Sequence, residues 1–222
     1  MKASKINIKS LSREELRSRL VEMGLKNYRA DQVLTWIYTH YALSFEDMTN
    51  IKKTERDMLS SVFVIPSPTV LRTEVSEDGT RKFLFALEDK HSIESVLIPD
   101  EDRQTLCISS QVGCQQACRF CLTGSGGFTR NLFAHEIVDQ VLEISRVLSQ
   151  EGGRGITNIV LMGMGEPLAN FDEVVKAIHI ITSDTGLGFS PRRVTLSTAG
   201  LAHGISALGK SGVNLNLALS LN

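Results

Sequence analysis

The feature that most constrains the fold is an alternation of strands and helices that begins at Gln104 and runs to the last residue. Short apolar segments of strand character alternate with amphipathic helical segments. Such an alternation is typical of an α/β protein with a parallel sheet, whose functional loops lie at the carboxyl ends of the strands. The expected strands are 104–109, 156–162, 192–198 and 213–221, and the expected helices are 134–148, 171–181 and 201–209.

The fourth of these strands finishes together with the chain at Asn222, and no helix follows it. Parallel strands are normally covered on both faces. We therefore expect the 222 residues to be part of a longer protein, the alternative being a complete small half-barrel.

The first part of the chain has a helical pattern. Ser12 and Glu15 form a capping box at the start of a helix, and Gly24 is its expected stop. A second helix is predicted at 30–40 and a weaker third one at 51–62. Residues 1–66 are thus predicted to be a small helical accessory domain.

Between the helices and the α/β region, the hydrophobic period changes to that of strands. Segments 69–76, 81–88 and 91–99 are strand-like, and Asp78-Gly79 is a strong hairpin signal. Residues 67–99 are therefore expected to form an antiparallel β meander that links the helical domain to residues 100–222.

Composition is that of an ordinary globular chain, with 42% hydrophobic residues and a net charge of −1. No apolar run approaches the roughly 20 residues of a membrane span, and the N-terminus has no apolar secretory core. These features favour a cytoplasmic protein without membrane contact. Residues 1–30 hold eight Lys and Arg against three Glu, which indicates either phosphate contact or a solvated helix face.

All four cysteines lie within fifteen positions, at Cys107, Cys114, Cys118 and Cys121. Cytoplasmic thiols stay reduced, so the cluster points to metal binding or catalysis rather than to disulfides. Three thiolates can hold a [4Fe–4S] cluster and leave one iron open. The alternative is zinc with Cys107 as the fourth ligand, which is disfavoured because Cys107 lies inside a predicted strand, two residues from its end.

A second motif follows the next strand, in the sequence Gly163-Met164-Gly165-Glu166. Glycines let the backbone approach a ligand closely, and Glu166 adds a carboxylate that can accept a hydrogen bond from an ammonium group. Combined with the cysteine loop, this turn becomes a specific signal.

The C-x3-C-x2-C loop and the glycine turn together resemble the radical S-adenosylmethionine (SAM) superfamily. The fold class that this implies is α/β, a partial radical SAM barrel preceded by the helical domain and the meander. A cluster ligated by Cys114, Cys118 and Cys121, and SAM bound at the open iron, are the implied cofactors. Phe120 matches the aromatic residue often found before the last cysteine.

The segments SIESVLIP, TLCISSQVGC, CRFCLTGSGGFTRNL, MGMGEPLAN, RRVTLSTAG and LALSLN are similar, in this order, to the RlmN-type dual-specificity RNA adenine-C2 methyltransferases. The helical segment MGLKNYRADQVLTWIY is also similar to that family. The resemblance implies roles for further residues. Glu94 matches a carboxylate that accepts a proton, although an ordinary strand residue is the alternative. The SAM-contacting positions match Gly165, Glu166, Ser197, Ser220, Leu221 and Asn222, the last replacing a His of many relatives.

The resemblance also implies that Cys107 is a second catalytic thiol rather than a metal ligand. In the family, a C-terminal cysteine carries the methyl group and is joined covalently to the RNA. The thiol matching Cys107 then helps to release the product and forms a disulfide that is later reduced. Proton removal falls either to this thiol or to the carboxylate matching Glu94. No cysteine follows Cys121, so the 222 residues alone are not expected to methylate RNA.

The implied function is formation of 2-methyladenosine in 23S rRNA and tRNA, with a flavodoxin-type electron donor and a monomeric enzyme. The alternatives are the sister Cfr-type activity at adenine C8 and a non-catalytic iron–sulfur or RNA-binding protein. The segment GSGGFTRN, with Arg130, is expected to be a flexible loop beside the site that either touches a ligand or is only a connection.

Overall fold

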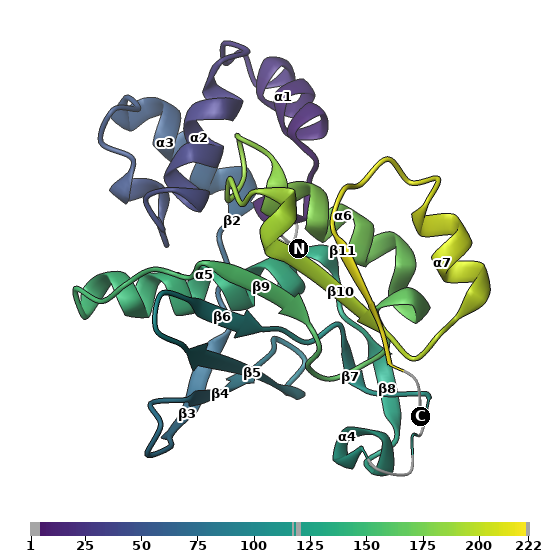
Figure 1. Ribbon diagram of the computed structural model, residues 1–222. Coiled ribbons are helices and arrows are strands. Elements are labelled where there is room, and N and C mark those ends of the chain that lie inside the picture. The colour runs from purple at the N-terminus through teal and green to yellow at the C-terminus, as the bar shows by residue number, and fades with distance from the viewer. Residues whose placement is uncertain (1–4, 117, 119–120, 221–222) are drawn as a thin grey trace. The chain divides into compact units, whose positions relative to one another are not determined.

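The computed structural model describes residues 5–116, 118 and 121–220, and the chain divides into two compact units (Figure 1). One unit comprises the chain up to Ser67 together with Ser183–Gly188. The other comprises Pro68–Thr182 and the chain from Phe189 onward.

The first unit is helical, as predicted, with α1 (Arg13–Glu22), α2 (Arg29–Tyr38) and α3 (Lys53–Val62). The predicted capping box is present, because Ser12 Oγ accepts from the Glu15 N–H and Glu15 accepts from the Ser12 N–H. The helix stops before Gly24, whose φ of +79° suits glycine. The buried core of the unit includes Leu16, Leu20, Val33, Ile37 and Leu59.

Short elements complete this unit. The strands β1 (Ile6–Asn7) and β2 (Phe63–Val64) pair in parallel, and 3₁₀ turns occupy Ile8–Ser10 and Phe45–Asp47. The two-residue strands were not predicted, since a pair of residues carries no readable period.

The second unit is built on a seven-stranded sheet with the order β11-β10-β9-β6-β5-β4-β3. The four predicted parallel strands are all present, and the three strands of the meander continue the same sheet in antiparallel pairing. The described strands form an open sheet of the predicted α/β class. Their bounds are β3 (Thr69–Val75), β4 (Arg81–Ala86), β5 (Ser92–Pro99), β6 (Gln104–Cys107), β9 (Asn158–Leu161), β10 (Val194–Thr198) and β11 (Asn216–Leu219).

The two faces of this sheet differ in their cover. Along β5, Ile93, Ser95 and Leu97 are buried, whereas the alternate residues Glu94 and Val96 are partly exposed. The buried face lies against α5 (Ala134–Gln150), because Ser95 donates to Gln140 of that helix. The helix α6 (Phe171–Thr182) packs beside α5, and α7 (Ala202–Leu208) follows β10. We call the opposite face, which carries Glu94, the open face.

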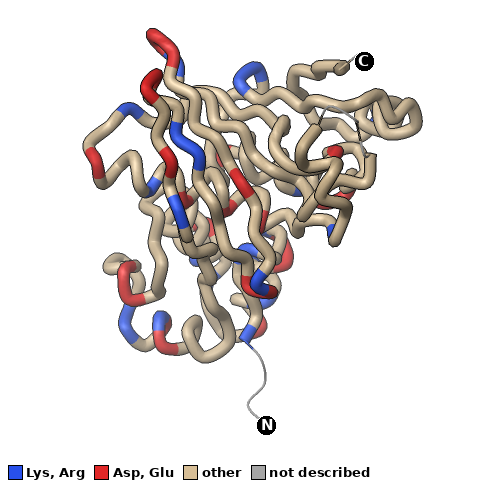
Figure 2. Tube along the Cα trace, turned by 90° about the horizontal axis from the view of Figure 1, so that it is seen from below, with Lys and Arg blue, Asp and Glu red and all other residues tan. Residues whose placement is uncertain are grey.

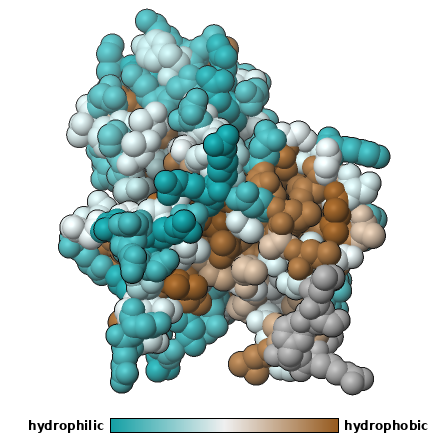
Figure 3. Space-filling view, in the orientation of Figure 1, coloured by the Kyte–Doolittle hydropathy of each residue, from teal (hydrophilic) through white to brown (hydrophobic). Residues whose placement is uncertain are grey.

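At one edge of the sheet, β11 exposes apolar side chains. Leu217 and Leu219 are each about half exposed, and apolar residues gather over this part of the surface (Figure 3). Within the described residues, no helix is both long enough and apolar enough to cross a membrane.

The expectation of a flexible loop at GSGGFTRN is wrong. After a short helix, α4 (Leu122–Ser125), the strand β8 (Phe128–Asn131) pairs with β7 (Gln111–Gly113) in a hairpin that encloses the cysteine loop. The hairpin depends on Gly113, which has φ +76° and approaches Gly127 so closely that a Cβ there would lie 2.0 Å from the Gly127 carbonyl oxygen. Three- and four-residue strands next to paired glycines give too little alternation to be recognised.

We predict that Gly113→Ala destabilises the chain more than Gly212→Ala, measured by urea denaturation. Both glycines have positive φ, and a Cβ at Gly212 meets nothing within 4 Å. The control should therefore cost only about 1 kcal/mol of backbone strain, while Gly113→Ala adds a steric cost of roughly 1–3 kcal/mol. Equal losses would contradict the close approach of the two strands.

Candidate active site

The open face of the sheet brings Glu94 and Cys107 together. Val96 lies opposite Cys107 in the antiparallel pair of β5 and β6, so the two side chains share a face. Glu94 is two residues from Val96 and therefore lies on the same face. The two predicted catalytic residues are thus diagonal neighbours across two strands.

Ser197 and Ser220 lie on this face too. Cys107 is opposite Val160 of β9, which is opposite Thr195 of β10, and Ser197 follows two residues later. The hydroxyl of Ser197 lies 3.4 Å from that of Ser220, just after β11. Leu221 and Asn222, the other predicted SAM contacts of this segment, lie outside the described residues, as does Phe120.

Cys107 is the last residue of β6, not two residues inside the strand as predicted. The strand ends early because the chain then turns to contact the loop after β9, where the Gly163 N–H donates to the Ile108 carbonyl. Burial raises the pKa of the Cys107 thiol, and a smaller opposing effect comes from the Met162 backbone N–H. At neutral pH, Cys107 is therefore a protonated, partly buried thiol.

The three other cysteines follow in the loop between β7 and α4. The Cys114 N–H donates to the Gly127 carbonyl, and the Cys121 N–H donates to the Cys118 carbonyl. All three thiols are free and partly exposed. Burial raises the pKa of Cys114, and the charges of Cys118 and Cys121 raise it further, as expected for neighbouring thiols.

Three free thiols in one loop are a donor set that fits an iron–sulfur cluster with one open iron. Within the described part of the chain, no three His, Cys, Asp or Glu side chains converge closely enough to hold a metal ion. The donor chemistry thus fits the group, while the thiols are not already gathered around a point.

The glycines of the turn after β9 are required by contact with the segment after β6. A Cβ at Gly165, whose φ is +101°, would lie 2.5 Å from the Gln111 Cβ. A Cβ at Gly163 would lie 2.7 Å from the Ser109 Oγ. The turn therefore packs directly on the strand end that leads into the cysteine loop.

Glu166 is almost fully buried, and each of its carboxylate oxygens already accepts a backbone N–H. One oxygen accepts from Leu168 at 3.0 Å and the other from Ala199 at 2.8 Å. The side chain thus ties the loop after β9 to the loop after β10. An additional ammonium group would have to share these oxygens rather than find them free.

Glu94 is neither isolated nor simply solvated. Its side chain is about 43% exposed and pairs with Lys82 at 3.3 Å, and Lys82 also pairs with Glu74 at 3.0 Å. These two carboxylates raise the pKa of Lys82. Acidic and basic residues are interspersed along the antiparallel strands, as Figure 2 shows.

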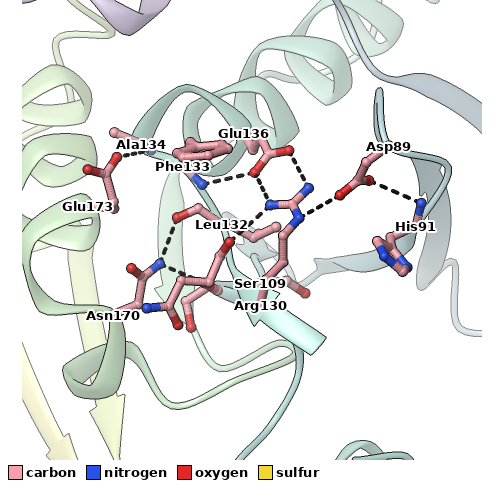
Figure 4. Close-up of polar contacts among 12 residues, drawn as sticks. Asp89, His91, Ser109, Arg130, Leu132, Phe133, Ala134, Glu136, Asn170 and Glu173 are labelled. Atoms are coloured by element: carbon pink, nitrogen blue, oxygen red, sulfur yellow. Dashed lines mark hydrogen bonds and ion pairs between the residues drawn. The ribbon is translucent and has the colours of Figure 1, made fainter. Parts of the chain in front are cut away.

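Arg130 is held by carboxylates of the protein itself (Figure 4). Its guanidinium donates twice to Glu136 at 2.7 and 2.8 Å and once to Asp89 at 2.6 Å. These pairs raise the pKa of Arg130. These pairs fix β8 against the start of α5.

A pocket of about 660 Å³ lies between Gln115 and the starts of α5, α6 and α7. None of the described residues predicted to act in catalysis or to bind a cofactor lines it. The pocket therefore adds nothing to the site on the open face.

Sequence reasoning missed a set of buried polar residues that connect these parts, namely Ser109, Gln111, Gln140 and Asn170. One signal was readable. Gln140 interrupts the apolar stripe of Ile137, Val141 and Ile144 on α5, and a polar residue at such a position must find partners inside the protein.

Comparison with known proteins agrees with this arrangement of cysteine loop and glycine turn. Residues 108–221 match the model of the radical SAM superfamily. The chain belongs to the radical SAM superfamily. Residues 6–65 match the ribosomal RNA large subunit methyltransferase N-terminal domain, a second match that is more specific than the superfamily.

Two relatives that are about 50% identical to the chain share the name dual-specificity RNA methyltransferase RlmN. The chain is 48% identical over its whole length to the dual-specificity RNA methyltransferase RlmN of Syntrophus aciditrophicus, covering 63% of that protein. It is 51% identical over 98% of its length to the RlmN of Geobacter sulfurreducens, covering 58% of it. The crystal structure of a radical SAM methyltransferase from Sphaerobacter thermophilus superposes with a TM-score of 0.90 at 40% identity, over 97% of this chain and 63% of that one. The predicted family resemblance and fold class are confirmed, and the chain spans about 60% of the length of these relatives.

We predict that alkylation of Cys107 by iodoacetamide increases only above the ordinary cysteine pKa of about 8.5, because the thiolate is the nucleophile and burial raises the pKa of this thiol. Tandem mass spectrometry would follow the labelling at this position as a function of pH. The same residue in the urea-unfolded chain is the control and should titrate near 8.5. A folded-state midpoint at or below that of the unfolded chain would contradict the prediction.

Proposed function

We propose that this chain carries the cofactor-binding part of a radical SAM methyltransferase that forms 2-methyladenosine in 23S rRNA and in tRNA. The observation that carries the proposal is the shared open face, on which Cys107 is a free thiol beside Glu94, while three other thiols follow in the adjoining loop. The names of the relatives, dual-specificity RNA methyltransferases, support RNA as the substrate.

In this proposal, Cys114, Cys118 and Cys121 hold a [4Fe–4S] cluster. Backbone groups of Gly165 and Glu166, with Ser197 and the Ser220-Leu221-Asn222 segment, hold SAM. The bound cluster and SAM supply a reductively generated adenosyl radical. A flavodoxin-type protein is the proposed electron donor, and a monomer in the reducing cytoplasm is the proposed working form.

The remaining chemistry belongs to residues on the open face. Glu94 is partly exposed and can take the C2 proton of the adduct that forms when a carbon radical has added to adenine C2, with Lys82 holding its carboxylate in place. Cys107 is protonated at neutral pH and becomes a nucleophile on losing its proton. Its thiolate can attack the sulfur of the methyl-carrying cysteine, so that a disulfide forms, the bond from that sulfur to the RNA-bound carbon breaks, and the released carbon takes a proton. The methyl-carrying cysteine of the family has no counterpart among the four cysteines of this chain.

We predict that anaerobic reconstitution loads about four irons per chain, and that SAM changes the EPR spectrum of the reduced cluster, because three ligands leave one iron open. Iron analysis and EPR of the 222-residue chain test this directly. Cys118→Ala is the control and should lose the cluster. A single zinc ion with no effect of SAM would instead indicate a non-catalytic metal protein.

A further inference from the structure

The chain leaves β6 through a segment, Ser109–Gln111, that is completely buried and largely outside the regular sheet. Its backbone bonds to the turn after β9, since the N–H groups of Ser110 and Gln111 both donate to the Met164 carbonyl, at 2.8 and 3.1 Å. The Ser110 carbonyl accepts from the Leu132 N–H, just before α5. The segment therefore connects the strand of Cys107, the glycine turn and the helix start.

Gln140 is fully buried in α5 and pairs with the backbone N–H and carbonyl of Ser109, which have no partner in a neighbouring strand. Its Oε1 accepts from the Ser109 N–H at 2.8 Å and from the Ser95 hydroxyl at 2.7 Å. Its Nε2 donates to the Ser109 carbonyl at 2.9 Å and to the Glu136 carbonyl at 3.3 Å. Every hydrogen of the amide is used, and its oxygen accepts twice.

The Ser109 hydroxyl continues this connection to the functional residues. It donates to the Glu94 carbonyl at 2.6 Å and accepts from the Met164 N–H at 2.9 Å. One buried hydroxyl therefore joins the backbone of the proposed proton acceptor to the turn proposed to bind SAM. Cys107 lies two residues before this junction on the same chain segment.

We propose that Gln140 and Ser109 are positioning residues that hold the Met164–Glu166 turn in register with the strand ends bearing Glu94 and Cys107. They act through backbone atoms and touch no reacting atom. The inference rests on the proposed function for the meaning of the turn as a cofactor site, but the register itself is a property of the chain without cofactor.

The chemistry of the site explains why an amide is needed. Ser109 presents both a donor and an acceptor to α5, and glutamine supplies both at the required length. Glutamate would supply only acceptors when ionised, and methionine would fill the space while leaving buried N–H and C=O groups without partners. Loss of these bonds should free the junction locally rather than only lower global stability.

The test compares Gln140→Met and the milder Ser109→Ala with Ile144→Ala, a buried apolar control on the same helix. Hydrogen exchange of the cofactor-free chain is measured first. Gln140→Met and Ser109→Ala are both expected to lose protection against exchange selectively at the amides of 109–111 and 164–166. The loss should be at least about tenfold, a factor that corresponds to 1.4 kcal/mol of local opening. Ile144→Ala is compared at a urea concentration equally far below its own unfolding midpoint and is expected to show no such selectivity.

The second readout is SAM binding by the reconstituted chain. Gln140→Met and Ser109→Ala are both expected to keep their iron but to bind SAM on the order of tenfold more weakly, with an altered EPR spectrum of the SAM complex. Ile144→Ala is expected to bind SAM as the wild type does. Unchanged exchange at the two segments, or the same changes in Ile144→Ala, would overturn the positioning role. Absence of cluster or SAM binding in the wild type would overturn the proposed function, while the exchange result would still decide the register.

Discussion

The proposed site of the second unit depends on how the chain satisfies its backbone after β6 ends. A strand that stops inside the protein leaves N–H and C=O groups that must find partners, because water does not reach them. Here the partners are the backbones of Met164 and Leu132 and the side chains of Gln140 and Asn170. The bonds that satisfy the segment are also the bonds that join the cysteine loop to the glycine turn.

This constraint gives a second meaning to residues that the family pattern assigns to ligands. Gly163 and Gly165 are glycines because the turn approaches Ser109 and Gln111 within the space of a Cβ. Glu166 is engaged by two backbone N–H groups and links successive strand ends. The proposed cofactor site and the internal packing therefore share the same few positions, and a substitution there is expected to affect both.

The elements themselves were largely predictable, because α5, α6 and the longer strands carry clear periods and the capping box at Ser12 marks the start of α1. The family and the α/β class were predictable from the cysteine and glycine motifs. The shared face of Glu94 and Cys107 was not, because it depends on the register between β5 and β6, and a shift of one residue would place Glu94 on the other face. Asp89 lies 41 residues from Arg130, and Ser95 and Ser109 lie 45 and 31 residues from Gln140, so local pattern does not show these contacts.

We propose that the four cysteines have two separate roles, with three as cluster ligands and Cys107 as a free thiol on the open face. Alkylation of the reconstituted, cluster-loaded chain at a pH above the Cys107 pKa, followed by tandem mass spectrometry, tests it most directly. We expect label on Cys107 and protection of Cys114, Cys118 and Cys121, with all four labelled after the cluster is removed. Protection of Cys107 together with the other three in the loaded chain would contradict the account.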